Sequence, residues 1–474
     1  MPEPAAVAGR PGPSLEARVV ARLRATFDAG VTRPLGWRRE QLQALRGLLV
    51  ADKAELLAAL AADLGKPAIE GLMTDLSFVR AEVDVLLAGL DEWSRPERVR
   101  VPLVQRPARA QVVREPLGVA LVIAPWNYPV HLLLAPMAAA LAAGNCVAGK
   151  PSEIAPATAA ALGRLVPRHL DQRAVAIVEG GVPEARSLLA ERFDHIFYTG
   201  NGRVGREVME AAARHLTPVT LELGGKSPAL VDRDADLAVA ARRIAWGKFI
   251  NAGQTCVAPD YVLVHRAVED QLVDGIARAV RRFYGDDPAS SPDYARIVSD
   301  RHFRRLTGLL EGSGAGSRAS VAVGGQADPA TRYLAPTVLR DVGAGDPVME
   351  EEVFGPILPV LAVQDMDEAA AFVRARPKPL ALYVFSGSEA TALKVVEGTS
   401  SGGVCVNGTV LHLAVHGLPF GGVGESGMGA YHGRHGFETF SHRRAVLTKP
   451  TRPDLPLAYP PYTRLRQWLL RRAL

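Results

Sequence analysis

The hydrophobic positions of the chain follow two different patterns. In the first 95 residues they recur at helical spacing, as at Leu42, Leu45 and Leu48, and a further helical pattern covers residues 69–93. From residue 118 onward, short apolar runs alternate with helical stretches, which is typical of a parallel sheet with helices on both faces. The runs that predict strands are GVALVI (118–123), CVAG (146–149), AVAIVEG (174–180), HIFYTG (195–200) and TPVTLEL (217–223).

A second series of the same kind begins after the Gly-Gly pair at 224–225. Its predicted strands are YVLVH (261–265), VAVGG (321–325), LALYVF (380–385) and GGVCVN (402–407). A chain of 474 residues is long enough for two or three domains. The pattern therefore predicts two α/β domains, divided near this glycine pair.

The longest uncharged stretch, residues 116–149, could be mistaken for a membrane span. Pro125, Pro129 and Pro136 divide it, and the helical run at 132–143 is too short to cross a bilayer. A buried strand, loop and helix are expected there instead.

Composition and charge exclude several classes of protein. The chain has 48% hydrophobic and 22% charged residues, and its net charge of +5 gives no indication of a nucleic-acid partner. The three cysteines lack the spacing of a disulfide framework or a zinc site, which favours a reducing, cytoplasmic compartment. His412 and His416 have no third ligand nearby in the sequence, so no metal is expected. Residues 1–14 lack the features of a signal peptide and are predicted to be a disordered extension.

Several turns that follow predicted strands carry polar residues suited to chemistry. Lys150 and Glu153 in GKPSE suit a ribose or phosphate oxygen, Asn127 in APWNYP suits an oxyanion, and Glu222 in TLELGGKSP suits a general base. The glycines of HIFYTGNGRVG could present backbone N–H groups to a phosphate. Each motif alone is also compatible with a structural role: a solvated loop, a locally bonded turn asparagine, an exposed strand residue or a plain strand–helix turn.

The cysteines and two further loops leave similar alternatives. Cys256 in GQTCVAP is either a nucleophile or a small core residue beside a turn, whereas Cys146 and Cys405 lie in apolar runs that predict core positions. Phe354 in EEVFGP and Phe420 in LPFGGVGESGMG either pack under their loops or flank a ring-shaped ligand.

Taken together and in order, these motifs resemble those of the aldehyde dehydrogenase superfamily. The resemblance covers about residues 15–460, and HLTPVTLELGGKSP and YHGRHGFETFSHRR look like its class 3 branch, which includes the fatty aldehyde dehydrogenases. It implies NAD(P)-dependent oxidation of an aldehyde, medium- or long-chain aliphatic or aromatic, to the carboxylic acid. The reaction would pass through a thiohemiacetal and a thioester on the catalytic cysteine.

The resemblance also implies a role for each matching residue. Cys256 would be the nucleophile, Asn127 would hold the oxyanion together with the Cys256 backbone N–H, and Glu222 would activate the hydrolytic water. Glu352 would hold the ribose next to the nicotinamide, and Lys150 and Glu153 would hold the adenosine ribose. The implied cofactor-binding residues are Trp126, Lys150, Glu153, Gly200, Asn201, Gly205, Leu223, Glu352 and Phe354.

Two details bear on the cofactor. The family usually has Gly-Ser-Thr where Gly200, Asn201 and Gly202 stand, so Asn201 must replace the serine contact to the pyrophosphate or that contact is lost. Glu153 would repel the 2′-phosphate of NADP, so NAD is expected, with NADP as the alternative.

The resemblance implies an aldehyde dehydrogenase fold with a Rossmann-like cofactor domain, a second α/β catalytic domain and a small β oligomerisation arm, assembled as a homodimer. The expected divisions are 15–96 with 116–223 for the NAD(P)-binding domain, 224–416 for the catalytic domain, and 97–115 with 417–450 for bridging segments. Residues 451–474 are predicted to be a basic amphipathic tail that either packs on the body or lies weakly at an anionic membrane surface.

The motifs leave two alternative functions open. An acylating or phosphate-reducing relative would pass the thioester to another acceptor, and it lacks the glutamate that Glu222 matches. A non-catalytic protein of the same fold would have no need to keep Cys256, Glu222 and Asn127 together.

Overall fold

The computed structural model describes residues 14–312, 318–452, 454 and 459–473. The predicted disordered extension lies outside this range except for Ser14. The Ser14 hydroxyl accepts a hydrogen bond from the Ala17 N–H and so caps the first helix.

Six strands form the first sheet, in the order β17-β7-β6-β3-β4-β5. β17 pairs antiparallel with β7, and all the other pairs are parallel. β3 and β4 are buried along their whole length, as expected for strands covered on both faces. The predicted parallel sheet is therefore confirmed. Its strands are β3 (Val119–Ile123), β4 (Cys146–Lys150), β5 (Val175–Ile177), β6 (His195–Gly200), β7 (Val219–Leu223) and β17 (Gly427–Met428).

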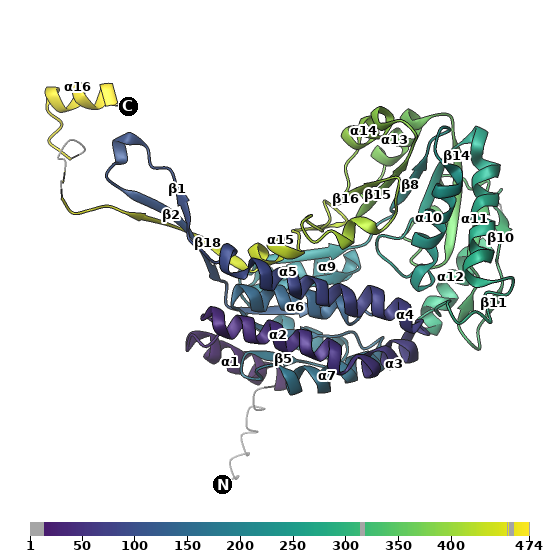
Figure 1. The fold of residues 1–474 in the computed structure, drawn as a ribbon, viewed down its shortest axis with the longest axis horizontal. Helices are drawn as coiled ribbons and strands as arrows, with labels where there is room; N and C mark the ends of the chain where they lie inside the picture. The colour runs from purple at the N-terminus through teal and green to yellow at the C-terminus, as the bar shows by residue number, and fades with distance from the viewer. Residues whose placement is uncertain (1–13, 313–317, 453, 455–458, 474) are drawn as a thin grey trace, which may run out of the picture.

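Helices cover this sheet, and the uncharged stretch supplies the most deeply buried of them. Every residue of α6 is buried, because α6 packs on β3 and β4 with α2, α5 and α15 against it (Figure 1). Among the described residues, no helix has the length and apolarity needed to cross a membrane. The helices are α1 (Leu15–Asp28), α2 (Leu35–Ala51), α3 (Lys53–Leu64), α4 (Ala68–Gly71), the π-helical η1 (Leu72–Leu76), α5 (Ser77–Trp93), α6 (His131–Ala143), α7 (Pro156–His169), α8 (Val182–Ala190), α9 (Gly202–Ala213) and α15 (Gly433–Thr439).

Seven strands form the second sheet, in the order β10-β13-β14-β9-β8-β15-β16, and only β10 runs antiparallel to its neighbour. Its strands are β8 (Pro228–Val231), β9 (Tyr261–His265), β10 (Ser320–Val323), β13 (Thr337–Arg340), β14 (Ile357–Val363), β15 (Ala381–Phe385) and β16 (Gly403–Val406). The accompanying elements are α10 (Leu237–Phe249), η3 (Ile250–Gly253), η4 (Arg266–Val268), α11 (Glu269–Tyr284), α12 (Asp300–Gly312), η5 (Pro347–Met349), α13 (Met366–Arg374), α14 (Glu389–Gly398), η6 (Leu411–Ala414) and a hairpin of β11 (Ala327–Asp328) with β12 (Tyr333–Leu334).

A three-stranded arm projects from the body, and helix α16 (Arg464–Ala473) lies beyond it (Figure 1). The arm consists of β1 (Glu97–Val99), β2 (Arg109–Pro116) and β18 (Ser441–Thr448), with η2 (Leu103–Gln105) at the β1–β2 turn. All eight residues of β18 pair with β2. Segment 417–450 thus contributes to both the first sheet and the arm; the domain limits and the oligomerisation role stay predictions.

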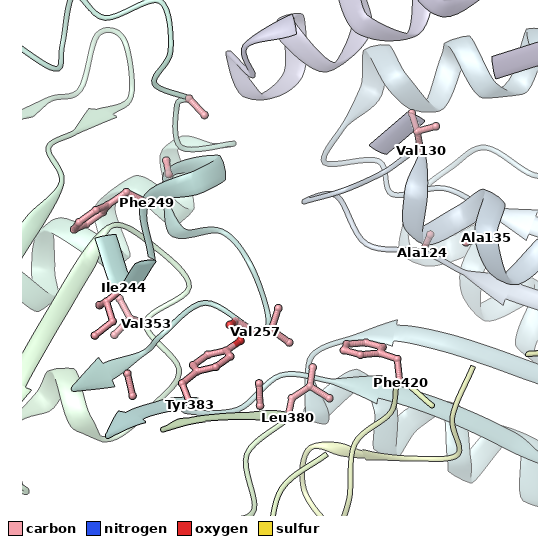
Figure 2. Packing of buried hydrophobic residues seen from close by; sticks show 14 of the residues in the cluster. Ala124, Val130, Ala135, Ile244, Phe249, Val257, Val353, Leu380, Tyr383 and Phe420 are labelled. Carbon is pink, nitrogen blue, oxygen red and sulfur yellow. Dashed lines mark hydrogen bonds between the residues drawn. The ribbon is translucent and has the colours of Figure 1, made fainter. Parts of the chain in front are cut away.

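One hydrophobic core joins the two large sheets. It contains Val122 of β3 and Phe197 of β6 together with Leu263 of β9. Figure 2 shows Val257, the residue after Cys256, beside Tyr383 of β15, whose hydroxyl donates a hydrogen bond to the Val257 carbonyl. The segment that carries Cys256 is therefore fixed to the core of the second sheet.

Candidate active site

A cavity of about 420 Å³ lies at the carboxyl ends of β3, β4, β6 and β7 and reaches across to the second sheet. This is the end of a parallel sheet at which ligands bind. Eleven of the twelve predicted site residues line the cavity: Trp126, Asn127, Lys150, Glu153, Gly200, Asn201, Glu222, Leu223, Cys256, Glu352 and Phe354.

Gly205 is the exception, because it lies inside α9 and not at the cavity wall. A Cβ atom at this position would lie 3.0 Å from Cδ2 of Leu223. The close packing of α9 on β7 therefore explains why a glycine stands at this position.

A second cavity, of about 200 Å³, opens on the other side of Cys256. Cys256 and Leu132 line both cavities. The walls of the second cavity are otherwise mainly apolar or aromatic: Met73, Phe78, Tyr128, Trp246, Ile250, Val257, Val410, Leu411, Leu413, Ala414, Phe420 and Tyr431, with Thr74, Thr255, His131 and His432. Phe420 therefore belongs to this apolar cavity.

The turn before Cys256 has an unusual backbone. Asn251 and Ala252 have φ angles of 53° and 51°, in the left-handed region that non-glycine residues rarely adopt. Gly253 follows with φ 74°, and a Cβ there would lie 2.3 Å from the Gly355 carbonyl oxygen. The turn thus brings the partly buried Cys256 to the junction of the two cavities.

Burial raises the pKa of the Cys256 thiol, and the nearby negative charges of Glu352 and Glu222 raise it further. The protonated thiol is therefore the resting form. Since the thiolate is the reactive form, the thiol must lose its proton before it attacks.

Glu222, which lines the same cavity, is a buried carboxylate. It is 3% exposed, it lies opposite Thr199 of β6, and neither carboxyl oxygen has a hydrogen-bond partner among the described residues. Burial raises the pKa of Glu222 well above its ordinary value. Once ionised in this surrounding, the carboxylate is a stronger base than one in water.

Asn127 lies in the loop between β3 and α6 and is 2% exposed. Its side-chain nitrogen donates to the Gln254 carbonyl oxygen over 3.0 Å. An amide nitrogen carries two hydrogens, so this bond leaves a second donor for an oxyanion in the cavity that Asn127 and Cys256 share.

Lys150 and Glu153 lie close together at the end of β4. The Lys150 ammonium donates to the carbonyl oxygens of Pro151 at 3.0 Å and Gly180 at 2.6 Å, and it lies 3.3 Å from Glu153 Oε2. The Glu153 side chain is 45% exposed, whereas that of Lys150 is 4% exposed. The lysine is therefore fixed, and the glutamate faces the open part of the cavity.

Asn201 is the N-cap of α9, and its side-chain oxygen accepts the Val204 N–H at 3.0 Å. The side chain of Asn201 thus serves the helix, whose N-terminal end opens on the cavity. The backbone N–H groups at the N-terminal end of α9 are the donors that could meet a phosphate at this point.

Glu352 lies across the cavity, and a Cβ on Gly224 would lie 1.9 Å from its Oε2 atom. Burial raises the pKa of Glu352 to about 8, with the charge of Asp260 adding to the effect. Phe354 packs edge-on against Trp126, with ring centroids 5.4 Å apart. These groups form one wall of the polar cavity.

The aldehyde dehydrogenase family model matches residues 16–446 of the chain. The chain belongs to the aldehyde dehydrogenase family. It is 50% identical over 446 residues to mouse (Mus musculus) "Aldehyde dehydrogenase family 3 member A2", covering 94% of this chain and 91% of that protein. It is 48% identical over 445 residues to the dog (Canis lupus familiaris) "Aldehyde dehydrogenase, dimeric NADP-preferring", covering 94% and 97%.

A solved structure is also similar: Staphylococcus aureus AldH in its substrate-bound state has a TM-score of 0.94 and 41% identity and covers 97% of this chain and 99% of that one. The predicted resemblance and fold are thus confirmed. As an aldehyde dehydrogenase, the protein oxidises an aldehyde with NAD or NADP.

The cavity of this aldehyde dehydrogenase fits a nicotinamide dinucleotide. It combines a helix N-terminus for a diphosphate, the fixed Lys150, and carboxylates of Glu153 and Glu352 that can accept bonds from ribose hydroxyls. Among the described residues, no group of three or more His, Cys, Asp or Glu side chains is arranged to hold a metal ion. Cys146 lies buried in β4, and Cys405 lies partly buried in β16.

Sequence reasoning missed a set of polar residues behind the site. Lys66, Glu70 and Asp75 lie in the segment between α3 and α5, which includes α4 and η1. Asn251 and Gln254 lie in the turn before Cys256. The sequence contains no signal that would bring the first three to the site, because this contact depends on how the helices pack. His302 and Arg305 of α12, which also line the polar cavity, were missed for the same reason.

Proposed function

We propose that this aldehyde dehydrogenase oxidises apolar aldehydes, aliphatic or aromatic, with Cys256 as nucleophile, Asn127 as oxyanion donor and Glu222 as general base. The position of Cys256 where a polar and an apolar cavity meet carries this proposal. The aldehyde carbon would sit at Cys256, with its apolar body in the second cavity. Mouse aldehyde dehydrogenase family 3 member A2, the relative of 50% identity, supports the assignment to this branch.

The first chemical step joins the Cys256 sulfur to the aldehyde carbon. The thiol gives up its proton to solvent water, and the carbonyl oxygen becomes an oxyanion that Asn127 Nδ2 and the Cys256 backbone N–H stabilise. The nicotinamide, when bound, supplies the hydride acceptor, so that the carbon is left as a thioester on Cys256.

The second step hydrolyses this thioester. Glu222 takes a proton from a water molecule, the water oxygen bonds to the acyl carbon, and the bond to the Cys256 sulfur breaks. The raised pKa of Glu222, caused by burial, suits this role. An acylating or phosphate-reducing enzyme would have no need of such a base.

A direct assay tests this function. Purified protein is incubated with NAD and a medium-chain aldehyde, without coenzyme A or phosphate, and the absorbance of the reduced cofactor is followed. We expect turnover under these conditions. Turnover only with coenzyme A or phosphate would favour the acylating alternative, and none with any acceptor would favour a non-catalytic protein. A panel of aliphatic chain lengths and aromatic aldehydes then defines the substrate.

We further propose a homodimer in the cytoplasm, built through the three-stranded arm, and NAD as the preferred cofactor. The dog relative is named as dimeric, and the arm offers a sheet that a second copy could extend. A monomer mass in solution would overturn the assembly. The same relative is named as NADP-preferring, so the cofactor preference rests on Glu153 alone.

A further inference from the structure

A buried ionic cluster from the N-terminal helices reaches the back of the catalytic site. The Lys66 ammonium lies 2.9 Å from Asp75 Oδ2, and both side chains are fully buried. The same ammonium donates to the Asn127 carbonyl oxygen over 3.1 Å and lies 4.1 Å from the centre of the Tyr128 ring. Lys66 thus holds the main chain of the residue whose side chain would bind the oxyanion.

Glu70, in the same part of the chain, holds the turn before the nucleophile. It is 9% exposed, and its Oε1 accepts the Asn251 N–H over 2.9 Å. Asn251 and Ala252 are the two non-glycine residues of this turn with left-handed φ angles, and such a backbone persists only where its surroundings fix it.

The side chain of Asn251 then joins the two segments. Its amide nitrogen donates to the Asn127 carbonyl oxygen at 2.8 Å and to the Gln254 carbonyl oxygen at 3.2 Å. The Gln254 carbonyl also receives the Asn127 side-chain amide. Asn251 thus bonds both the Asn127 carbonyl and the carbonyl that receives the Asn127 amide, and Glu70 holds the Asn251 backbone from behind.

We propose that Glu70 and Lys66 are positioning residues that set the Asn127 amide against Cys256 without touching the substrate. This rests on the proposed function, which assigns the oxyanion to Asn127 and the attack to Cys256. A buried ion pair adds little to stability compared with apolar residues of the same volume, so stability alone does not account for this cluster. Placement of the Asn127 amide against Cys256 accounts for the cluster, because a shift of about 1 Å in a reacting group can cost about 100-fold in rate.

Substitutions at Glu70 separate placement from charge. Glu70→Gln keeps an oxygen that can accept the Asn251 N–H but removes the charge, whereas Glu70→Asp keeps the charge on a side chain one methylene too short. We expect Glu70→Gln to retain most of kcat. Glu70→Asp should lose about 10-fold and Glu70→Ala about 100-fold, with the aldehyde KM and the cofactor Kd nearly unchanged.

The matched controls are Asp194→Ala and Asp194→Asn. Asp194 Oδ2 accepts the Val119 N–H at 2.7 Å, a bond of the same kind at the opposite end of β3. These variants should lower the thermal midpoint and leave kcat per folded enzyme unchanged.

The proposal is overturned if Glu70→Asp retains more kcat than Glu70→Gln, or if the Glu70 variants lower kcat no more than the Asp194 variants do. The comparison of Asp with Gln decides the matter even if Glu70→Ala does not fold. Failure of the proposed function is a separate result, because activity in a Cys256→Ala variant would refute the function whatever the Glu70 variants show.

Discussion

The two cavities that meet at Cys256 differ in chemistry and in origin. The polar cavity is bounded by Lys150, Glu222 and Glu352, and most of it is built from turns at the ends of consecutive strands. The apolar cavity gathers η1, α6, α10 and η6, which are far apart in the sequence. One half of the site can hold a charged, hydrogen-bonding cofactor, and the other can exclude water from an apolar substrate. The cysteine between them brings the two together.

The largest expected effect comes from removing the reactive group that lines both cavities. Cys256→Ala should abolish dehydrogenase activity, because no bond to the aldehyde carbon can form. Cys146→Ala and Cys405→Ala are the matched controls and should keep most of the activity, since neither cysteine lines either cavity. Steady-state production of the reduced cofactor is the measurement. More than a few per cent of residual activity in Cys256→Ala would show that the mechanism is wrong.

The next effect isolates the base at the edge of the polar cavity. Glu222→Gln keeps the shape of the side chain and removes the proton acceptor, so the thioester should accumulate. Rapid mixing should show one burst of reduced cofactor, near one per active site, followed by slow turnover. Equal loss of the burst and of the steady rate would place the role of Glu222 before hydride transfer.

The contrast between the cavities also explains what the sequence could predict. Strand alternation predicted the first sheet, and several residues of the polar cavity, such as Asn127, Lys150 and Asn201, lie at the carboxyl end of a strand or directly after it, so their positions were predictable. The exception was Gly205, which packs α9 on β7. The cluster of Lys66, Glu70 and Asp75 was not predictable, because its contacts join residues up to 181 positions apart. Buried charges of this kind have no periodicity, and only the packed structure shows what they bind.

A smaller effect concerns the cofactor end of the polar cavity. Glu153→Gln should raise the ratio of kcat/KM for NADP over NAD by about 3- to 10-fold, because a negative charge near the ribose repels a 2′-phosphate. The effect is limited because the side chain is 45% exposed and its charge is screened by water. Glu55→Gln, an exposed carboxylate paired with Arg164 on another helix, is the control and should leave the ratio unchanged. An unchanged ratio in Glu153→Gln would remove the argument for NAD.

The smallest expected effect tests whether the C-terminal tail adds to the apolar surface that the second cavity offers to the substrate. In α16, Leu465 and Trp468 are 66% and 50% exposed, so the described part of the chain leaves this apolar face largely uncovered. The Arg472 guanidinium lies 4.3 Å from the centre of the Trp468 ring. Such a combination of aromatic, aliphatic and basic side chains suits weak, salt-sensitive contact with an anionic membrane surface, and the helix is too short to span one.

Deleting residues 462–474 should therefore reduce sedimentation with anionic liposomes at low salt, while leaving the chemistry at Cys256 intact. It should also lower activity toward long-chain aldehydes more than toward short ones, if the tail lies near the substrate entrance. Replacing Arg464, Arg466, Arg471 and Arg472 by Gln is the matched control for charge: liposome binding should fall and the chain-length preference should stay. If the deletion changes neither liposome binding nor chain-length preference, the tail serves neither purpose. The apolar surface available to the substrate is then that of the second cavity.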